Sequence, residues 1–347
     1  MKKNISLIIL FGWIAGMQSS YGQVTLPGTK VEYLESENVD QKFELQINLP
    51  SGYEENSEKF GVVYVLDAQW DFPLVYALYG EQYYDGFIPP LILVGITWDG
   101  DTNYRSRDFT PTPQNGNGGE ASKFLRFIME ELSPYIESNY KADPNSRTIM
   151  GSSLGGLFTM YAALESDGFF HNFIPTSPAY GWDNGALIRL EEEFHESGKS
   201  LNGRMYSAIG GVEGNVKGYE EFMKKIQSRN YEGFELEYKI LQNIGHSGSK
   251  AEGDTRGLQF VFERNSIELS KDQLKKITGK YSTENYTVEL VGNNGKPILK
   301  YPNGYEVALT AESETSFYLP DAFLNLKITK EGFVLERFGS SEEFVKK

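Results

Sequence analysis

The first hundred residues carry two kinds of hydrophobic pattern. Residues 31–36 and 42–50 alternate apolar and polar positions, and this alternation predicts two half-buried strands. Residues 60–68 (FGVVYVLDA) and 91–98 (LILVGITW) are almost continuously apolar. Such runs are typical of strands that are buried on both faces of a parallel sheet.

Helical and strand-like patterns alternate through the next part of the chain. Residues 121–141 place apolar side chains at helical spacing, and Pro134 should kink this helix or restart it. Four further short strands, separated by helices, are predicted between residues 147 and 265. This alternation indicates an α/β fold with a doubly wound, mostly parallel sheet that has antiparallel strands at its start.

After about residue 267 the pattern changes again. A short helix, KDQLKKI, is followed by alternating strands that are separated by GNNG and PNG turns. We therefore expect a large α/β domain at residues 23–267 and a small all-β domain at residues 268–347.

The N-terminus has the pattern of a secretory signal peptide at residues 1–22. Lys2 and Lys3 precede an apolar stretch at residues 7–17, and small residues stand before a cleavage point at Gln23. The apolar stretch is too short to span a bilayer, and no later segment approaches the required ~20 apolar residues. We expect an exported protein, periplasmic or extracellular, without a membrane anchor; the alternative is an uncleaved anchor.

Composition narrows the classes of function. The formal net charge of -15 argues against nucleic acid or an anionic membrane surface as partner, because both require a basic patch. The chain has no cysteine, which excludes disulfides, thiolate catalysis and zinc–sulfur sites. Its 3 histidines are too few and too far apart for a metal cluster, so we expect no metal and no cofactor.

The stretch RTIMGSSLGGLF contains a candidate nucleophile. Residues 151–155 fit the motif G-x-S-x-G with Ser153 at its centre, between a β-branched strand and an apolar helix. In this motif the serine occupies a sharp strand-to-helix turn, and the flanking glycines prevent steric clashes around it. We therefore predict Ser153 as the nucleophile and interpret Ser152 as structural.

A serine nucleophile requires a base, and an acid that orients the base. His246 lies in a glycine-rich loop after the last predicted strand, whereas His171 and His195 have the surroundings of surface residues. In the order serine–acid–histidine, Glu213 directly follows a strand, and Asp183 is the rival one strand earlier. A serine–histidine dyad without a firm acid is the remaining alternative.

The oxyanion of the tetrahedral intermediate requires two backbone N–H donors. One should be the N–H of Leu154, the residue after the nucleophile. The other should come from the loop after the strand VVYVLDA, where Gln69 is the expected donor and Ala68 and Trp70 are its neighbours.

These stretches, together with RSRDFTPTP, FIPTSPAYGWDN, GGVEGN and the GHS loop, resemble the putative-esterase family of α/β-hydrolases. This group holds esterase D-like and enterochelin (trilactone siderophore) esterase-like enzymes, and the resemblance spans roughly residues 31–265. It implies an α/β-hydrolase fold with Ser153 as nucleophile, His246 as base and Glu213 as acid.

The resemblance also bears on residues around the pocket. It implies that Tyr180 and Trp182 lie near the pocket, and that Arg107 and Asp108 belong to a structural element that fixes a loop. The sequence departs from the family pattern at Ser152, where histidine is usual, and at LDA, where many members have LDG. The C-terminal segment resembles the small lipocalin-like domains that are appended to secreted serine hydrolases.

We therefore expect an exported serine esterase that hydrolyses carboxylic esters through an acyl-enzyme. One alternative substrate is a siderophore lactone, for which Arg105 and Arg107 are the nearby cations. Another is an acetyl or feruloyl ester on a polysaccharide, which would suit the aromatic residues Trp70, Tyr104, Tyr180 and Trp182. A general short-chain ester is the third. A different class of function, an inactive hydrolase fold that acts as a binding protein, is the further alternative.

Overall fold

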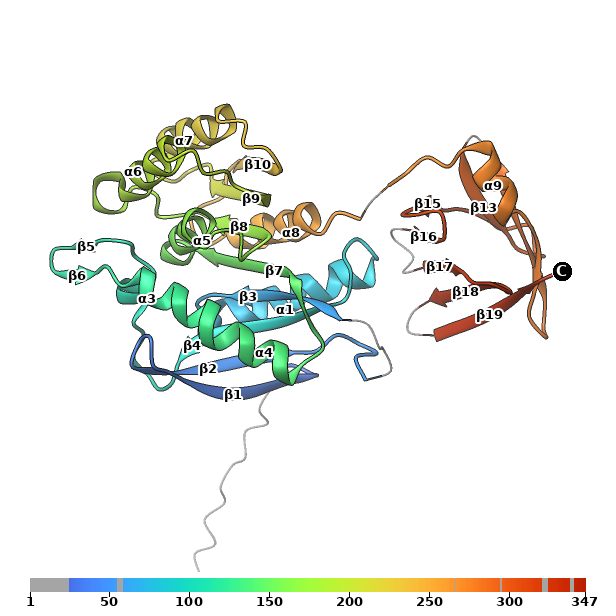
Figure 1. The fold of residues 1–347 in the computed structure, drawn as a ribbon, viewed down its shortest axis with the longest axis horizontal. Helices are drawn as coiled ribbons and strands as arrows, with labels where there is room; N and C mark the ends of the chain where they lie inside the picture. Colours follow the sequence, from blue (N-terminus) through green and yellow to red (C-terminus); the bar gives the residue numbers. More distant parts are fainter. Residues whose placement is uncertain (1–24, 55–58, 265, 294, 320–323, 338–339) are drawn as a thin grey trace, which may run out of the picture.

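The structure is a computed structural model that describes residues 25–54, 59–264, 266–293, 295–319, 324–337 and 340–347. The predicted signal peptide at residues 1–22 lies outside the described residues. Within the described residues, a mixed sheet of 8 strands and an antiparallel sheet of 9 strands form the two main bodies of the fold (Figure 1).

The mixed sheet carries the candidate catalytic residues. Its strands lie in the order β1-β2-β4-β3-β7-β8-β9-β10. The pairs β1–β2 and β2–β4 are antiparallel and the others are parallel, which confirms the expected sheet with antiparallel strands at its start. The strands are β1 (Thr29–Ser36), β2 (Gln41–Asn48), β3 (Phe60–Val65), β4 (Leu91–Trp98), β7 (Ala142–Ser152), β8 (Asn172–Thr176), β9 (Gly203–Gly210) and β10 (Phe234–Leu241).

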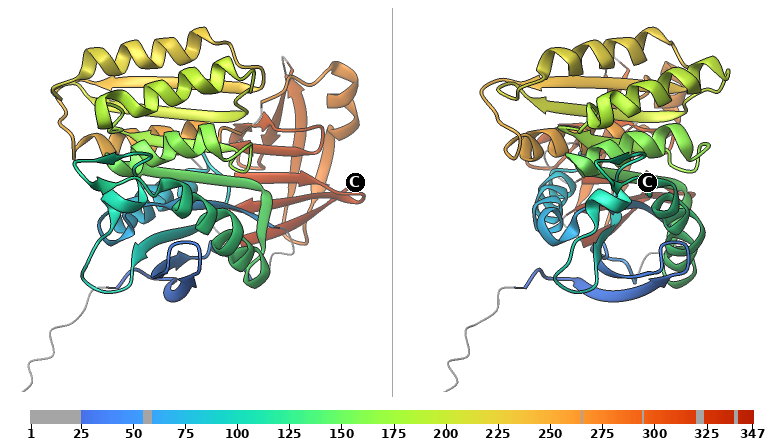
Figure 2. Two further views of the ribbon diagram at one scale, coloured as in Figure 1. Left: turned by 60° about the vertical axis from the view of Figure 1, so that its left-hand side comes forward. Right: turned by 90° about the vertical axis from the view of Figure 1, so that its left-hand side faces the viewer.

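Helices cover both faces of this sheet, as Figure 2 shows. On one face, α1 (Ala68–Tyr84) packs beside α8 (Ser249–Val261) over a buried apolar cluster. Five helices cover the other face over the largest cluster, and the short helix α2 (Arg105–Asp108) follows β4. The five helices are α3 (Ala121–Arg126), α4 (Ser133–Asn139), α5 (Leu154–Glu165), α6 (Trp182–Glu196) and α7 (Val216–Ser228).

The helix predicted at residues 121–141 is interrupted as its proline requires. A π-helical turn, Phe127–Leu132, joins α3 to α4, and Pro134 lies in the first turn of α4. Pro134 has no N–H to donate to the preceding turn, so the regular hydrogen-bond ladder of the helix cannot continue through this position.

The second sheet confirms an all-β C-terminal segment. After α9 (Lys271–Ile277), its strands follow the order β14-β13-β12-β11-β19-β18-β17-β16-β15, with every pair antiparallel. The two edge strands, β14 (Glu306–Ala308) and β15 (Thr310–Ala311), are consecutive in the chain, so the sheet curls into a nearly closed barrel. The others are β11 (Gly279–Ser282), β12 (Thr287–Asn293), β13 (Lys296–Lys300), β16 (Ser316–Leu319), β17 (Leu324–Ile328), β18 (Gly332–Arg337) and β19 (Ser340–Lys346).

Arg264, which follows α8, ties the two bodies together. Its guanidinium forms two hydrogen bonds with the carboxylate of Glu312, a third with Asn325, and stacks 4.0 Å from the ring centre of Tyr318. Helix α8 has 13 residues and so extends for about 20 Å. The loop that carries His246 precedes the start of α8, so it is about this far from the segment that follows the helix and leads to the second sheet.

Candidate active site

Ser153 occupies the sharp turn between β7 and α5. Its backbone has φ 60° and ψ −116°, a region that a residue with a side chain rarely adopts and that costs about 1–3 kcal/mol. The N–H of Ser153 donates to the carbonyl of Thr176 at 3.1 Å, and its carbonyl accepts from the N–H of Ala179 at 2.9 Å. The loop after β8 therefore holds the strained turn from both sides.

Two glycines are required by the close packing of this turn. A Cβ on Gly151 would lie 2.8 Å from the carbonyl carbon of Gly155, and one on Gly156 would lie 2.9 Å from the Cα of Pro178. A Cβ on Gly155 would meet only ordinary contacts, the nearest at 3.4 Å. After the serine, the packing therefore requires a glycine at Gly156. It does not require one at Gly155, the last glycine of the motif. Ser152 ends β7, and its hydroxyl is buried without a hydrogen-bond partner among the described residues.

Glu213 and His246 come together at the ends of β9 and β10. The Nδ1 of His246 lies 2.7 Å from Oε2 of Glu213. The other carboxylate oxygen accepts from the N–H of Gly210 at 2.8 Å and from the hydroxyl of Ser177 at 2.6 Å. Burial alone would raise the pKa of Glu213, but the three hydrogen bonds lower it below its ordinary value. Glu213 is therefore ionised at neutral pH and can stabilise an imidazolium.

Two serines that the sequence did not single out support this pair. The Ser177 hydroxyl, which contacts Glu213, lies 2.7 Å from the hydroxyl of Ser249, and the Ser249 hydroxyl donates to the His246 carbonyl at 2.6 Å. Both serines are buried, and Ser177 has φ 42°. In the sequence, the only indication of this supporting role is that Ser177 directly follows β8 and Ser249 follows the GHS stretch.

The rival acid and the other histidines lie in different surroundings. Asp183 accepts a hydrogen bond from the Thr112 hydroxyl at 2.8 Å and pairs with Arg189 on α6. His171 Nδ1 lies 3.3 Å from the backbone N–H of Arg147, and His195 lies in the last turn of α6. The carboxylate that contacts His246 is that of Glu213.

The first turns of α1 and α5 are adjacent to each other, next to Ser153. Asp67, which precedes α1, has φ 53°, and its carbonyl accepts from the N–H of Trp70 at 2.9 Å. The first N–H groups of α1, on Ala68 and Gln69, have no acceptor within the helix. A Cβ on Gly155 would lie 3.4 Å from the Asp67 carboxylate, so the two helix starts are neighbours. Leu154 is the first residue of α5.

Charged side chains form a cluster behind these helix starts. Arg105 donates two hydrogen bonds to the Asp67 carboxylate at 3.1 and 2.8 Å. Lys250 Nζ lies 2.5 Å from Oδ1 of Asp71. Asp254 accepts from the Thr176 hydroxyl, and its complete burial raises its pKa to about 7. Burial also raises the pKa of Asp67, although Arg105 opposes this shift.

The residues predicted to contact substrate are anchored in different ways. Trp70 is 55% exposed, and Tyr180 is buried with its hydroxyl on the Asn215 carbonyl. The indole of Trp182 donates to the carbonyl of Thr112 at 2.9 Å.

The guanidinium of Arg107 binds the next residue of its own loop. It donates two hydrogen bonds to the buried Asp108, and Asp108 also accepts from the indole of Trp98. This geometry is that of a loop-fixing pair.

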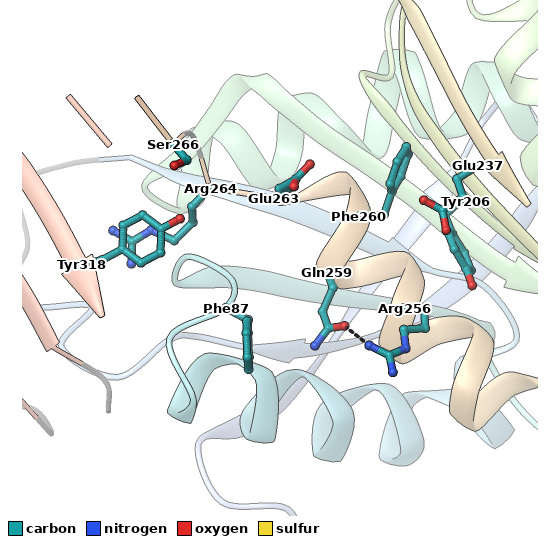
Figure 3. A pocket seen from close by; sticks show the side chains of 10 residues that line it. All are labelled: Phe87, Tyr206, Glu237, Arg256, Gln259, Phe260, Glu263, Arg264, Ser266 and Tyr318. Atoms are coloured by element: carbon teal, nitrogen blue, oxygen red, sulfur yellow. Dashed lines mark hydrogen bonds between the residues drawn. The ribbon is translucent and has the colours of Figure 1, made fainter. Parts of the chain in front are cut away.

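One cavity of the structure lies away from these residues. About 560 Å³ in volume, it opens at the junction of the two bodies and is lined by Phe87, Tyr206, Phe260 and Tyr318 among others (Figure 3). None of its lining residues belongs to the loops that carry Ser153, Glu213 or His246.

The described residues contain no group of three or more His, Asp or Glu side chains placed to bind a metal ion. No helix in the described ranges combines the length and apolar character that a membrane span requires.

An α/β sheet that presents a serine on a strained strand-to-helix turn is typical of serine hydrolases. The chain belongs to the family described as "Putative esterase", whose family model matches residues 36–211, and it hydrolyses carboxylic esters. The match includes Ser153 and ends before Glu213 and His246.

Relatives and solved structures agree with this assignment. The chain is 28% identical over 271 residues to the ferri-bacillibactin esterase BesA of Bacillus subtilis (strain 168), covering 71% of this chain and 93% of that protein. An IroE-like serine hydrolase from Shewanella oneidensis is 27% identical with a TM-score of 0.63, over 72% of this chain and 85% of that one. The BES protein from Bacillus cereus shares the fold, with a TM-score of 0.63 at 22% identity, over 70% of this chain and 98% of that one.

Proposed function

We propose that the protein is an exported serine esterase that opens the lactone esters of a siderophore through Ser153, His246 and Glu213. The observation that carries the proposal is the 2.7 Å contact between His246 Nδ1 and Glu213, in loops neighbouring the strained Ser153 turn. A carboxylate on Nδ1 fixes the proton there and leaves Nε2 free to act as a base.

The reaction proceeds in two halves. Ser153 Oγ attacks the ester carbonyl while His246 Nε2 takes the hydroxyl proton, and His246 then gives that proton to the leaving alkoxide. A water molecule, deprotonated by His246, attacks the acyl-enzyme, and the proton returns to Ser153 as the acid product leaves. Glu213 stays ionised throughout and stabilises the imidazolium, in agreement with its lowered pKa.

The oxyanion is stabilised by the N–H groups of Leu154 and Gln69. Each belongs to the first turn of a helix, where the N–H has no acceptor within the helix and the dipole favours negative charge. The N–H of Trp70 is excluded as a donor because it is bound to the Asp67 carbonyl.

The substrate assignment draws on the relatives. BesA is named as a ferri-bacillibactin esterase, and the solved neighbours include siderophore hydrolases of Aspergillus nidulans. A siderophore trilactone contains the carboxylic esters that this chemistry cleaves. The exposed indole of Trp70, at the start of α1, would supply an aromatic surface for a catechol ring.

Two further proposals concern the architecture and the destination of the protein. We infer that the mixed sheet is the sheet of the α/β-hydrolase fold, which the strand order and the serine turn support. Export is supported by the pattern of residues 1–22, and N-terminal sequencing of the secreted protein should find Gln23 first.

Labelling with a fluorophosphonate probe, followed by peptide mass spectrometry, tests the nucleophile and its base. We expect a single adduct on Ser153 in the wild type and none in His246→Ala. Hydrolysis of iron-free enterobactin, followed by chromatography of the linear products, tests the substrate. A folded protein that takes up no probe would refute the serine mechanism, whereas labelling without lactone cleavage would refute only the substrate assignment.

A further inference from the structure

We propose that the cavity at the junction of the two bodies binds a neutral oligosaccharide. This binding is separate from the esterase reaction, because none of the lining residues belongs to the loops of Ser153, Glu213 or His246. The basis of the proposal is a set of aromatic rings and unpartnered polar groups of balanced charge around one open cavity (Figure 3).

Both bodies of the fold contribute to this cavity. Phe87 comes from the segment between α1 and β4, Tyr206 from β9 and Phe260 from α8. Tyr318 comes from β16 of the barrel. The volume of about 560 Å³ is within the usual range of ligand sites, about 300–1,000 Å³. The complete wall therefore exists only while the barrel is docked on the α/β domain.

Aromatic side chains form the apolar part of the wall. Figure 3 shows Tyr318 and Phe87 toward one end of the cavity. Phe260 and Tyr206 lie toward the other end, with their ring centres 6.0 Å apart. A sugar ring has an apolar face of C–H groups, and this face packs well against an aromatic ring. Rings at both ends suit a ligand of more than one sugar unit.

Two buried tyrosines of the wall have hydroxyl groups without a partner. Tyr206 is only 3% exposed and Tyr318 only 8%, yet neither hydroxyl forms a hydrogen bond with a described residue. Burial raises the pKa of Tyr206 to about 12, so this phenol stays protonated and able to donate. Because buried polar groups are nearly always hydrogen-bonded, these hydroxyls mark positions where a ligand would supply the partner.

Two of the charged residues of the wall are already neutralised from outside the cavity. Arg264 is bound to Glu312 of the barrel, and Glu263 pairs with Arg204 of β9. Each of these lining charges is therefore balanced by an opposite charge close to it. Neither attracts an ionic ligand strongly.

The other two charged residues of the wall are Arg256 and Glu237. Arg256 donates to the side chain of Gln259 and has no acidic partner within the described residues, and Glu237 has neither a hydrogen-bond nor an ion-pair partner among them. A guanidinium has only donors and a carboxylate only acceptors, whereas a sugar hydroxyl is both. One unpaired charge of each sign favours a neutral ligand that carries several hydroxyls.

The rim of the cavity is open to solvent. Phe87, Glu237, Arg256 and Ser266 are all exposed. Sites for free small molecules usually enclose most of the ligand surface, whereas a polymer requires a site from which the rest of the chain can leave. The open rim therefore favours a segment of a glycan chain over a free small molecule.

A glycan array, followed by isothermal titration calorimetry, tests the proposal on the wild-type protein. The array would carry xylo-, gluco- and manno-oligosaccharides beside uronic-acid and sulfated glycans. We expect binding to neutral oligosaccharides, with an affinity that changes little between low and high salt, because a neutral ligand is not screened. No binding on the array, or binding of acidic glycans only, would overturn the proposal.

Three substitutions locate the site. Phe87→Ala removes an exposed ring and Arg256→Ala the unpaired guanidinium, and each should weaken binding by about 10-fold. Tyr318→Phe removes only a hydroxyl and should weaken it by about 5-fold. The matched control is Tyr305→Phe, which changes an exposed tyrosine of the same barrel outside the cavity. Wild-type affinity in all three folded variants, or an equal loss in the control, would overturn the proposal.

Ester hydrolysis provides a separate readout. The three substituted residues lie outside the candidate active site, so kcat/KM for 4-nitrophenyl acetate should stay within about twofold of the wild-type value. If the siderophore lactone is cleaved but no glycan is bound, this inference fails and the proposed function stands. If a neutral glycan is bound through the cavity but no lactone is cleaved, the substrate assignment fails and this inference stands.

Discussion

Replacing Glu213 by Gln should abolish most of the activity while leaving the fold intact. The oxygen of Glu213 that accepts from Ser177 and Gly210 has a counterpart in the glutamine carbonyl, so both of these hydrogen bonds can persist. The other oxygen becomes an NH₂ group facing His246 Nδ1. Two donors cannot share that contact, so Nδ1 must become the acceptor and the proton must move to Nε2.

An imidazole in this tautomer cannot take the proton of Ser153. The comparable substitution in another serine hydrolase lowers turnover by about four orders of magnitude. We expect kcat/KM to fall by about 10³- to 10⁴-fold, which corresponds to about 4–5.5 kcal/mol of transition-state stabilisation. Because the packing and two hydrogen bonds are retained, the free energy of unfolding should change by only about 1–2 kcal/mol.

Initial rates with 4-nitrophenyl acetate measure the first quantity, and urea unfolding measures the second. Asp183→Asn is the matched control, because it neutralises the rival carboxylate, which contacts Thr112 and Arg189 instead. We expect this variant to stay within about threefold of the wild type. The assignment would be refuted by a Glu213→Gln enzyme with more than a tenth of wild-type activity, or by an equal loss in the control.

Three further substitutions test separate parts of the site. Ser153→Ala should remove turnover with almost no change in the thermal midpoint; a large loss of stability would instead make the serine structural. Gly156→Ala should destabilise the protein by about 1–3 kcal/mol through the Pro178 contact, while Gly155→Ala, in looser surroundings, should cost less; equal midpoints would contradict this. Asp254 has a folded-state pKa of about 7, above its ordinary 3.8, so its contribution to stability is lost as pH rises through this range. In urea titrations, the free energy of unfolding of the wild type should therefore fall relative to that of Asp254→Asn by up to a few kcal/mol between pH 4 and pH 8. A difference between the two proteins that stays constant with pH would refute the raised pKa of Asp254.

The alternation of strand and helix patterns was sufficient to predict the architecture. Continuous apolar runs occur where β3 and β4 are buried on both faces, and the alternating runs occur where β1 and β2 lie at one edge of the sheet. The helical spacing of apolar residues did not predict the π-helical turn at residues 127–132, because the apolar side chains of this turn are buried like those of the helix around it.

The candidate site was only partly predictable. The G-x-S-x-G motif marks Ser153, but the motif cannot tell that Gly156 is more tightly packed than Gly155, since that depends on where Pro178 lies. Arg105 could be proposed as a cation for an acidic ligand, but its pairing with Asp67 joins residues 38 positions apart. Such a contact exists only once the sheet has assembled.

The order of the proposed catalytic residues along the chain follows the order of the strands across the sheet. Ser153 follows β7, Ser177 follows β8, Glu213 follows β9 and His246 follows β10, and these four strands are consecutive neighbours. Adjacent strands lie about 4.8 Å apart, so loops at the ends of β7 and β10 begin about 14 Å from each other. A carboxylate at the end of β9 is beside the His246 loop, whereas Asp183 lies within α6, beyond the end of β8. The end of β8 connects the Ser153 turn to Glu213. The hydroxyl of Ser177 contacts Glu213, and the carbonyl of the preceding residue, Thr176, accepts a hydrogen bond from the N–H of Ser153. Parallel strand order therefore explains both why Glu213 is the acid that contacts His246 and why a serine from β8 supports it.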